Sequence, residues 1–296
     1  MLKRLPILCT ALLALAACGH SNDSSAPTAA PTAAPAASAP ASATPAPTPA
    51  TAGTAPASAP ATATSATTPA AAATVAAAPA APATATPFVE DPKWVEGKNY
   101  FRIEPAQPKV SNTDKIEVAE VFSYACPSCN AFHPMVDQLA KSLPSDAVMA
   151  YLPVSFMPQE NFPMFQRAFL TAQALGVAGK ANDAMYDAVW KSKVLSSERA
   201  DGQGLKPMSE LPTLADAAKF YAHYGVDPKE FLAVAKSFSI NTQVKRADEL
   251  VKAYGVEGTP TLVVDGKYRI DLRAAGGYAQ MVELAKYLVA KEAAGK

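Results

Sequence analysis

The stretch KIEVAEVFSYACPSC, residues 115–129, decides the fold of this chain. Its first ten residues, Lys115–Tyr124, are rich in β-branched and aromatic side chains and predict a central strand. Two cysteines separated by Pro127 and Ser128 follow at once, and a helix is expected from Pro127 to about Leu143. A CxxC pair at the point where a strand passes into a helix indicates thiol–disulfide chemistry.

The place of Cys126 at the start of the predicted helix favours its thiolate. The first backbone N–H groups of a helix have no partner within the helix, and the helix dipole adds positive potential there. Pro127 suits the first turn because it has no N–H to leave unpaired. We therefore predict that Cys126 is the nucleophile and that Cys129, one turn on, resolves the mixed disulfide.

A zinc half-site and a structural disulfide are the alternative interpretations of the pair. Zinc usually takes four ligands, whereas the chain has no second CxxC and only His133 and His223 after residue 20. A disulfide that closes so short a loop would stabilise little. We expect no metal site, and no cofactor beyond the cysteine pair itself, because no glycine-rich nucleotide motif is present.

The segments around the pair predict an α/β fold. A βαβ unit that contains the cysteines is followed by a helical block over about 162–238 and then by a ββα unit. A helix is expected from Asn241, as its N-cap, to Tyr254, with Gly255 ending it. The other expected elements are an edge strand Tyr100–Ile103, strands Ala147–Phe156, Pro260–Asp265 and Tyr268–Ile270, a hairpin turn at Asp265-Gly266, and a helix from Gly277 to about Glu292.

Residues 1–17 predict a lipoprotein signal peptide. Two basic residues precede an apolar run that is too short to span a membrane comfortably. The run ends in Leu-Ala-Ala before Cys18, which resembles the bacterial lipobox and implies a lipid on Cys18. Gly19, rather than Asp, follows this cysteine, which by the same resemblance favours the outer membrane. The alternative is an ordinary secretory signal with an incidental cysteine.

Residues 18–87 predict a disordered tether between the lipid and a folded domain over 88–296. From residue 24 to residue 87 the chain is Ala, Pro, Thr and Ser except for Gly53 and Val75. Such a sequence cannot bury enough apolar surface to offset its ordering entropy. A spacer that lifts the domain off a membrane and a linker of no selected length both fit this composition.

The charge balance limits the classes of binding partner that we expect, and the positions of the cysteines limit which thiols can react. Lys+Arg and Asp+Glu number 26 each, so no basic excess is available for phosphates, which argues against nucleic acid. Cys9 would leave with the signal and Cys18 would carry lipid. Cys126 and Cys129 would then be the only thiols of the mature chain.

The cysteine stretch and a second motif resemble the DsbA family of thioredoxin-like proteins. The resemblance implies a thioredoxin-like fold with an inserted helical domain, and a cis Pro260 beside the cysteines. It also implies that the backbone of Thr259 is presented to an extended substrate. Without the CPSC motif, Thr259-Pro260 would be interpreted as a trans turn. The resemblance spans about 100–289 and rests on FSYACPSC (Phe122–Cys129), AFLTAQALG (Ala168–Gly176) and Gly258-Thr259-Pro260.

The same resemblance places an acidic residue, Glu120, beneath the cysteine pair. There it would exchange protons with Cys129, a role that a buried carboxylate with a raised pKa would suit. The alternative is a solvent-facing strand charge beside Glu117. Pro134 stands where such proteins often kink the active-site helix. His133 could couple to Glu120, although a packed or exposed side chain is the expectation.

Ser128 departs from the strongly oxidising members of this family, which often carry Pro-His between the cysteines. A serine removes one possible cationic partner of the thiolate, although its hydroxyl can still donate a hydrogen bond. The hypothesis is a Cys126 pKa below that of a free thiol and a weaker oxidant than the Pro-His members.

The resemblance implies a monomeric oxidase that introduces disulfide bonds into reduced or unfolded proteins on the periplasmic side of the bacterial envelope. A DsbB-type quinone-linked membrane protein would regenerate its disulfide. One alternative is a reductase or isomerase of the same fold, although the isomerases considered carry an N-terminal dimerisation domain where this chain has its tether. The other is a non-catalytic lipoprotein that binds peptides or a metal ion.

Overall fold

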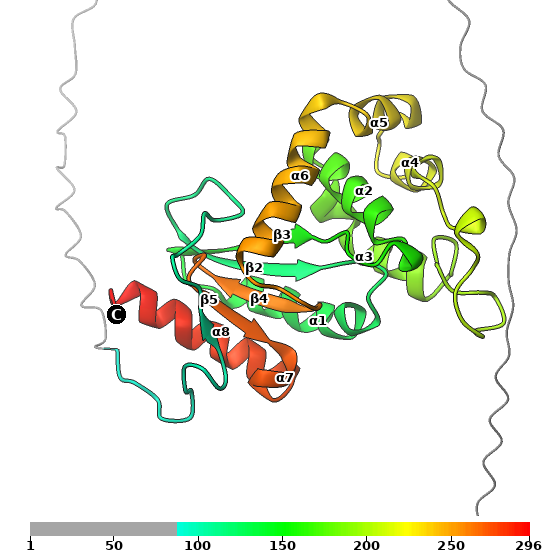
Figure 1. The fold of residues 1–296 in the computed structure, drawn as a ribbon. Helices are drawn as coiled ribbons and strands as arrows, with labels where there is room; N and C mark the ends of the chain where they lie inside the picture. Colours follow the sequence, from blue (N-terminus) through cyan, green and yellow to red (C-terminus); the bar gives the residue numbers. More distant parts are fainter. Residues whose placement is uncertain (1–87) are drawn as a thin grey trace, which may run out of the picture. The chain divides into compact units, whose positions relative to one another are not determined.

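The computed structural model describes residues 88–296, which form a five-stranded mixed sheet with helices on both faces (Figure 1). The predicted signal, Cys18 and tether lie outside the described residues. The strand order is β1-β5-β4-β2-β3. Within the described residues no helix combines the length and apolar character that a membrane span requires.

Strand β2 (Ile116–Phe122) occupies the interior of the sheet, as the sequence predicts. It pairs in parallel with β3 (Ala147–Pro153) and antiparallel with β4 (Thr261–Val264). Its last six residues are all buried, because both faces of the sheet are covered. The other strands are β5 (Tyr268–Asp271) and the edge strand β1 (Phe101–Arg102), which pair antiparallel.

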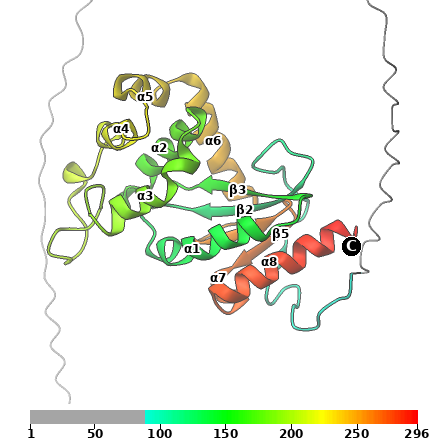
Figure 2. The same ribbon diagram turned by 180° about the vertical axis from the view of Figure 1, so that it is seen from behind.

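One face of the sheet is covered by α1 (Pro127–Ser142) and α8 (Tyr278–Ala293), which lie side by side in Figure 2. A four-residue helix, α7 (Leu272–Ala275), leads from β5 into α8. The apolar stripes of both helices bury against the sheet, since residues three and four apart share one helix face. This core includes Phe132, Val136 and Leu139 from α1, Leu284 and Leu288 from α8, and Val118 and Leu262 from the sheet.

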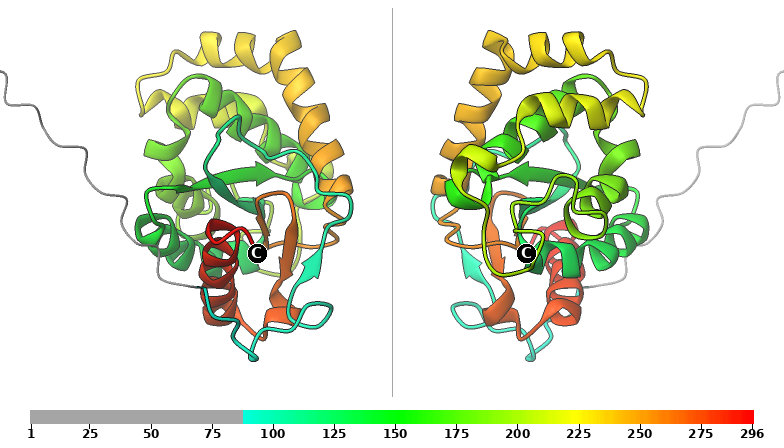
Figure 3. Two further views of the ribbon diagram at one scale, coloured as in Figure 1. Left: turned by 90° about the vertical axis from the view of Figure 1, so that its left-hand side faces the viewer. Right: turned by 90° about the vertical axis from the view of Figure 1, so that its right-hand side faces the viewer.

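The helical block predicted for about 162–238 is present between β3 and α6 (Phe238–Ala253). Its helices are α2 (Phe162–Ala174), α3 (Ala178–Trp190), α4 (Leu214–Ala222) and α5 (Pro228–Ala235), with short 3₁₀ turns at Pro158–Glu160 and Met208–Glu210. In Figure 3 this insertion (green to yellow) and α8 (red) lie on opposite sides of the molecule. Aromatic rings join it to the strand that leads to the cysteines: Phe122 lies 5.2 Å from Phe169, and Tyr124 lies 4.9 Å from Tyr186, between ring centroids.

The predicted start of the next helix is wrong by one turn. Helix α6 spans Phe238–Ala253, and Ser237 rather than Asn241 is its N-cap, because the Ser237 hydroxyl accepts a hydrogen bond from the Ile240 N–H at 3.2 Å. Asn241 lies in the first turn instead. Its side-chain oxygen accepts from Arg167 Nη1 at 2.7 Å, a contact that ties α6 to α2.

The β4–β5 connection is the predicted two-residue hairpin. Asp265 and Gly266 both have positive φ, 52° and 66°, as a type I′ turn requires. A Cβ at Gly266 would lie 2.1 Å from the carbonyl oxygen of Gln107, so glycine is required there. Gly255 (φ 65°) follows α6 and ends it, also as predicted.

Candidate active site

Both cysteines lie at the start of α1. Cys126 is the N-cap, with extended backbone (φ −80°, ψ 119°), and its Sγ accepts a hydrogen bond from the Cys129 N–H at 3.4 Å. Pro127 opens the helix and is exposed, whereas Ser128 is half-buried. Both cysteines are free, with 5% of Cys126 and none of Cys129 exposed. Cys126 is therefore the sulfur that an incoming thiol reaches first.

The two thiols have opposite pKa shifts. The pKa of Cys126 is lowered to about 6, first by a hydrogen bond with the Cys129 side chain and then by further contacts that include the backbone N–H groups of Ser128 and Cys129. The pKa of Cys129 is raised well above its usual value, chiefly by burial. The site therefore holds a thiolate at Cys126 and a protonated thiol at Cys129 near neutral pH.

The segment between α6 and β4 lies against Cys126. The Thr259-Pro260 peptide bond is cis, as the resemblance implies, and the Thr259 carbonyl oxygen lies 3.5 Å from Cys126 Sγ, where it accepts a weak hydrogen bond when that thiol is protonated. A surface hollow of about 690 Å³ runs beside this segment. Its lining includes Gly258, Thr259, Pro260, Arg269 and Leu272.

Glu120 lies two residues after Val118 on β2 and so faces the side of the sheet that α1 and α8 cover. Only 1% of its surface is exposed. Its Oε1 has no hydrogen-bond partner in the part of the chain that the structure describes. Burial, followed by the negative charges of Cys126 and Asp137, raises the pKa of Glu120 to about 8. This buried acid thus lies close enough to Cys126 for the charge of the thiolate to raise its pKa.

The alternative of a solvent-facing charge on this strand is wrong for both glutamates. Glu117 is also 1% exposed, and its carboxylate accepts hydrogen bonds at 2.7 Å from the backbone N–H groups of Val110 and Ser111, and another from the Ser111 hydroxyl. Both glutamates are buried because helices and loops cover both faces of the sheet. The alternation of residue types along the strand does not by itself indicate that both faces are covered.

His133 is packed, as expected, rather than paired with Glu120. It is 8% exposed, its ring stacks on Tyr186 at 4.4 Å between centroids, and its Nε2 lies 2.8 Å from Asp183 Oδ1 on α3. Pro134 lies inside α1, which continues through it to Ser142.

The insertion supplies neighbours of the cysteines that sequence reasoning missed. Trp190 donates from Nε1 to the Tyr124 carbonyl oxygen at 2.8 Å, which fixes the turn before Cys126. A hollow of about 140 Å³ beside Pro127 has walls from Trp190, Leu205, Glu160 and Glu198. Outside the insertion, Tyr151 on β3 lies opposite Glu120 in the sheet and was also missed. No local pattern marks these residues, since tertiary folding alone brings them to the site.

Comparison with known proteins gives a consistent family. Residues 117–289 match the model of the DSBA-like thioredoxin domain. The thiol:disulfide interchange protein DsbA of Pseudomonas aeruginosa (strain PAO1) is 36% identical over 201 residues, which cover 68% of this chain and 87% of the relative. DsbA of Azotobacter vinelandii is 35% identical over 196 residues, or 66% and 83% of the two chains.

Solved structures agree with the sequence relatives. The crystal structure of Pseudomonas aeruginosa DsbA has a TM-score of 0.58 at 35% identity and covers 69% of this chain and 96% of its own. The oxidoreductase DsbA from Xylella fastidiosa has a TM-score of 0.60 at 28% identity and covers 68% and 99%. The predicted fold and enzyme class are thereby confirmed. The chain belongs to the DsbA-like thioredoxin family and is a thiol–disulfide oxidoreductase.

Proposed function

We propose that this oxidoreductase introduces disulfide bonds into reduced or incompletely folded proteins of the bacterial envelope, with Cys126–Cys129 as its redox centre and no other redox cofactor. The observation that carries the proposal is the opposite pKa shift of the two thiols. A low pKa stabilises the reduced form through its thiolate, and a stabilised reduced form makes the disulfide a better oxidant.

The reaction begins with the pair oxidised. A substrate thiolate attacks Cys126 Sγ, the Cys126–Cys129 bond breaks, and its electron pair leaves on Cys129. A second substrate thiolate then attacks the substrate sulfur of the mixed disulfide and expels Cys126 as a thiolate. The substrate loses two electrons, the cysteine pair gains them, and the lowered Cys126 pKa favours its departure.

Glu120 serves the first of these steps as the proton donor to Cys129. A leaving thiolate in a site with no exposure needs a proton, because an unpaired buried charge is costly. With a pKa of about 8, Glu120 carries that proton at neutral pH. In the reverse direction, when the pair is reoxidised, the ionised fraction of Glu120 accepts the proton from Cys129.

Thr259 and Pro260 hold the substrate. The Thr259 carbonyl faces Cys126 Sγ at 3.5 Å, and the hollow of about 690 Å³ follows the same segment. An extended substrate segment that pairs with the Thr259 backbone would bring its cysteine to Cys126. Main-chain pairing makes few demands on substrate side chains, which suits an enzyme with many unfolded substrates.

The wider setting follows from the N-terminal prediction and the family. The protein acts as a monomer on the periplasmic side, anchored by lipid on Cys18, in the outer membrane. A DsbB-type quinone-linked membrane protein accepts the electrons and restores the disulfide. The predicted lipobox before Cys18 and the curated relatives named DsbA support this assignment.

Thiol trapping of Cys126 and Cys129 in intact cells tests the redox direction. We expect the pair to be oxidised in wild-type cells and reduced in cells without the DsbB-type partner. A variant with serine at both positions reports any labelling of other thiols. A pair found mainly reduced in wild-type cells would instead favour a reductase or isomerase.

A further inference from the structure

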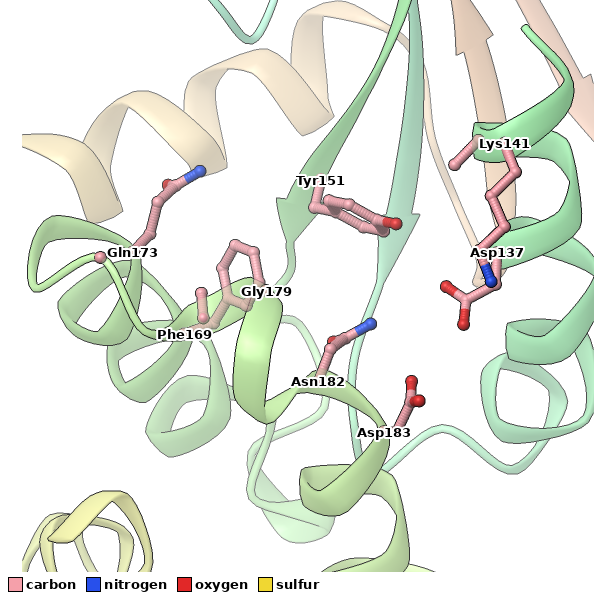
Figure 4. A pocket seen from close by; sticks show the side chains of 11 residues that line it. Asp137, Lys141, Tyr151, Phe169, Gln173, Gly179, Asn182 and Asp183 are labelled. Carbon is pink, nitrogen blue, oxygen red and sulfur yellow. The ribbon is translucent and has the colours of Figure 1, made fainter. Parts of the chain in front are cut away.

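Three potential metal ligands converge beside α1, one to two turns beyond Cys129 along the helix. His133 and Asp137 lie one turn apart on α1, and Asp183 reaches them from α3 in the insertion. His133 Nε2 lies 2.8 Å from Asp183 Oδ1 and 3.9 Å from Asp137 Oδ2, and one ligand atom of each residue lies within 4.8 Å of the others. Figure 4 shows the two carboxylates beside the same open space.

The imidazole of His133 is held in place for this role. More than nine-tenths of the residue is buried, and the stack on Tyr186 at 4.4 Å and 25° fixes the ring plane. Its Nε2 points at both carboxylates. A ligand whose orientation is fixed before binding loses little entropy when an ion arrives.

Apart from the imidazole of His133, the cluster has no basic side chain paired with its carboxylates among the described residues. Among the described residues neither Asp137 nor Asp183 makes an ion pair with any lysine or arginine, although Lys141 lines the same cavity. By contrast, Asp187, one turn further along α3, pairs with Lys191 Nζ at 2.7 Å. Two carboxylates that converge without a cationic partner repel each other, and a bound cation would relieve this repulsion.

Room for further ligands exists beside the three residues. Asp137 and Asp183 line a cavity of about 600 Å³, together with Tyr151, Asn182 and Gly179 among others. Neighbouring ligand atoms around an ion at about 2.0–2.2 Å are separated by roughly 3 Å or slightly more. The observed 2.8 and 3.9 Å separations therefore need only small side-chain movements to surround one ion.

We propose that His133, Asp137 and Asp183 bind one divalent transition-metal ion, such as Zn²⁺, with water from the cavity completing its coordination. An imidazole in the ligand set favours zinc and its first-row neighbours over Mg²⁺ and Ca²⁺, which prefer oxygen ligands. The ion joins α1, the helix that begins at Cys126, to α3 of the insertion. Its binding therefore stabilises the contact between these two parts of the fold.

Calorimetric titration with Zn²⁺ tests the site. The full-length protein is first oxidised, so that Cys126 and Cys129 are joined, and its remaining thiols are alkylated, so that no thiol binds the metal. We expect one ion per chain and a rise in the thermal midpoint. Titration with Co²⁺ should give the visible absorption of nitrogen and oxygen ligation. A wild-type protein that binds no Zn²⁺ overturns the proposal.

Matched variants on α3 separate a specific site from general surface attraction. Asp183 has 81% of its side chain exposed, so Asp183→Asn should fold normally and weaken Zn²⁺ binding at least tenfold. Asp183→His supplies another ligand atom and should retain binding. Asp187→Asn removes an equal charge one turn away and should bind as the wild type does. Wild-type affinity in Asp183→Asn, or an equal loss in Asp187→Asn, overturns the proposal.

Discussion

The two ends of β2 carry equally buried glutamates with opposite surroundings. Glu117, near the start of the strand, accepts hydrogen bonds from two backbone N–H groups and a hydroxyl. Glu120, near its end, leaves Oε1 without a described partner and has a pKa of about 8. Both are 1% exposed. Burial therefore does not distinguish a structural carboxyl group from a reactive one, whereas the supply of hydrogen-bond donors does.

This difference assigns separate tasks to the two ends of the strand. The Glu117 end ties the segment at Val110 and Ser111 to the sheet. The Glu120 end leads into the cysteine pair, and we propose that an acid without fixed donors changes its protonation state there. Changes at the two ends should accordingly separate stability from activity.

Replacing the nucleophile Cys126, which follows the Glu120 end of β2, should have the largest effect on activity. Cys126→Ser removes the sulfur that exchanges, so oxidation of a reduced peptide, followed by fluorescence, should fall at least about 10³-fold. The unfolding free energy of the reduced variant should change far less than its activity. Activity that survived in Cys126→Ser would instead support a non-catalytic binding lipoprotein.

Glu120→Gln should alter how stability depends on pH. The pKa of Glu120 is raised from 4.5 to about 8 on folding, so the folded state keeps a proton that the unfolded state releases. Between these values the stability contributed by Glu120 falls as the pH rises, by at most about 5 kcal/mol at pH 8. Below pH 4.5 the group is protonated in both states and contributes no pH dependence.

The variant carries no titrating group at this position and should escape that loss. Denaturant unfolding of the reduced proteins should therefore show Glu120→Gln gaining on the wild type from pH 5 to pH 8. The titration of Cys126 is present in both proteins and largely cancels in the comparison. A difference that does not vary with pH would mean that Glu120 has an ordinary pKa.

Glu117→Ala should lower the unfolding free energy by about 3 kcal/mol, because two partly buried backbone N–H groups and the Ser111 hydroxyl lose their acceptor. Glu117 does not touch the cysteines, so the folded variant should oxidise a reduced peptide at the wild-type rate. Urea unfolding measures the first effect and a peptide oxidation assay the second. A large loss of activity in the folded variant would remove the proposed separation between the two ends.

Sequence reasoning predicted those parts of the site that local chemistry dictates. The strand before Cys126, the helix start at Pro127 and the hairpin at Asp265-Gly266 each follow from residue types at fixed spacing, and the structure confirms them. The start of α6 was missed because Ser237 and Asn241 are both good caps. In the structure Ser237 accepts the capping hydrogen bond from the Ile240 N–H, and Asn241 contacts Arg167 on another helix instead.

Contacts between residues that are far apart in the sequence could not be predicted. His133 and Asp183 are fifty residues apart, and their meeting depends on how the insertion packs against α1. The prediction of no metal site was based on the number of cysteine and histidine ligands. It did not include carboxylates that a second helix brings to His133. The burial of Glu117 likewise depends on the segment at Val110 and Ser111, which contains no regular element to predict.

Ser128→His should produce the smallest of these changes, a shift in the Cys126 pKa and in the reduction potential of the cysteine pair. The Ser128 N–H is among the groups that lower the Cys126 pKa to about 6, and this contribution is retained in any variant. A histidine adds a cation near the thiolate, which should lower the Cys126 pKa further and stabilise the reduced form. The reduction potential should then rise by roughly 30 mV, equivalent to about 1.4 kcal/mol for a two-electron couple.

Equilibration with glutathione measures this potential, and the pH profile of Cys126 alkylation measures the pKa. Ser142→His is the matched control, because it adds the same side chain at the exposed far end of α1 and should leave both values unchanged. A potential that rises equally in both variants would trace the effect to overall charge. A rise confined to Ser128→His would show that the residue between the cysteines sets how strongly this enzyme oxidises.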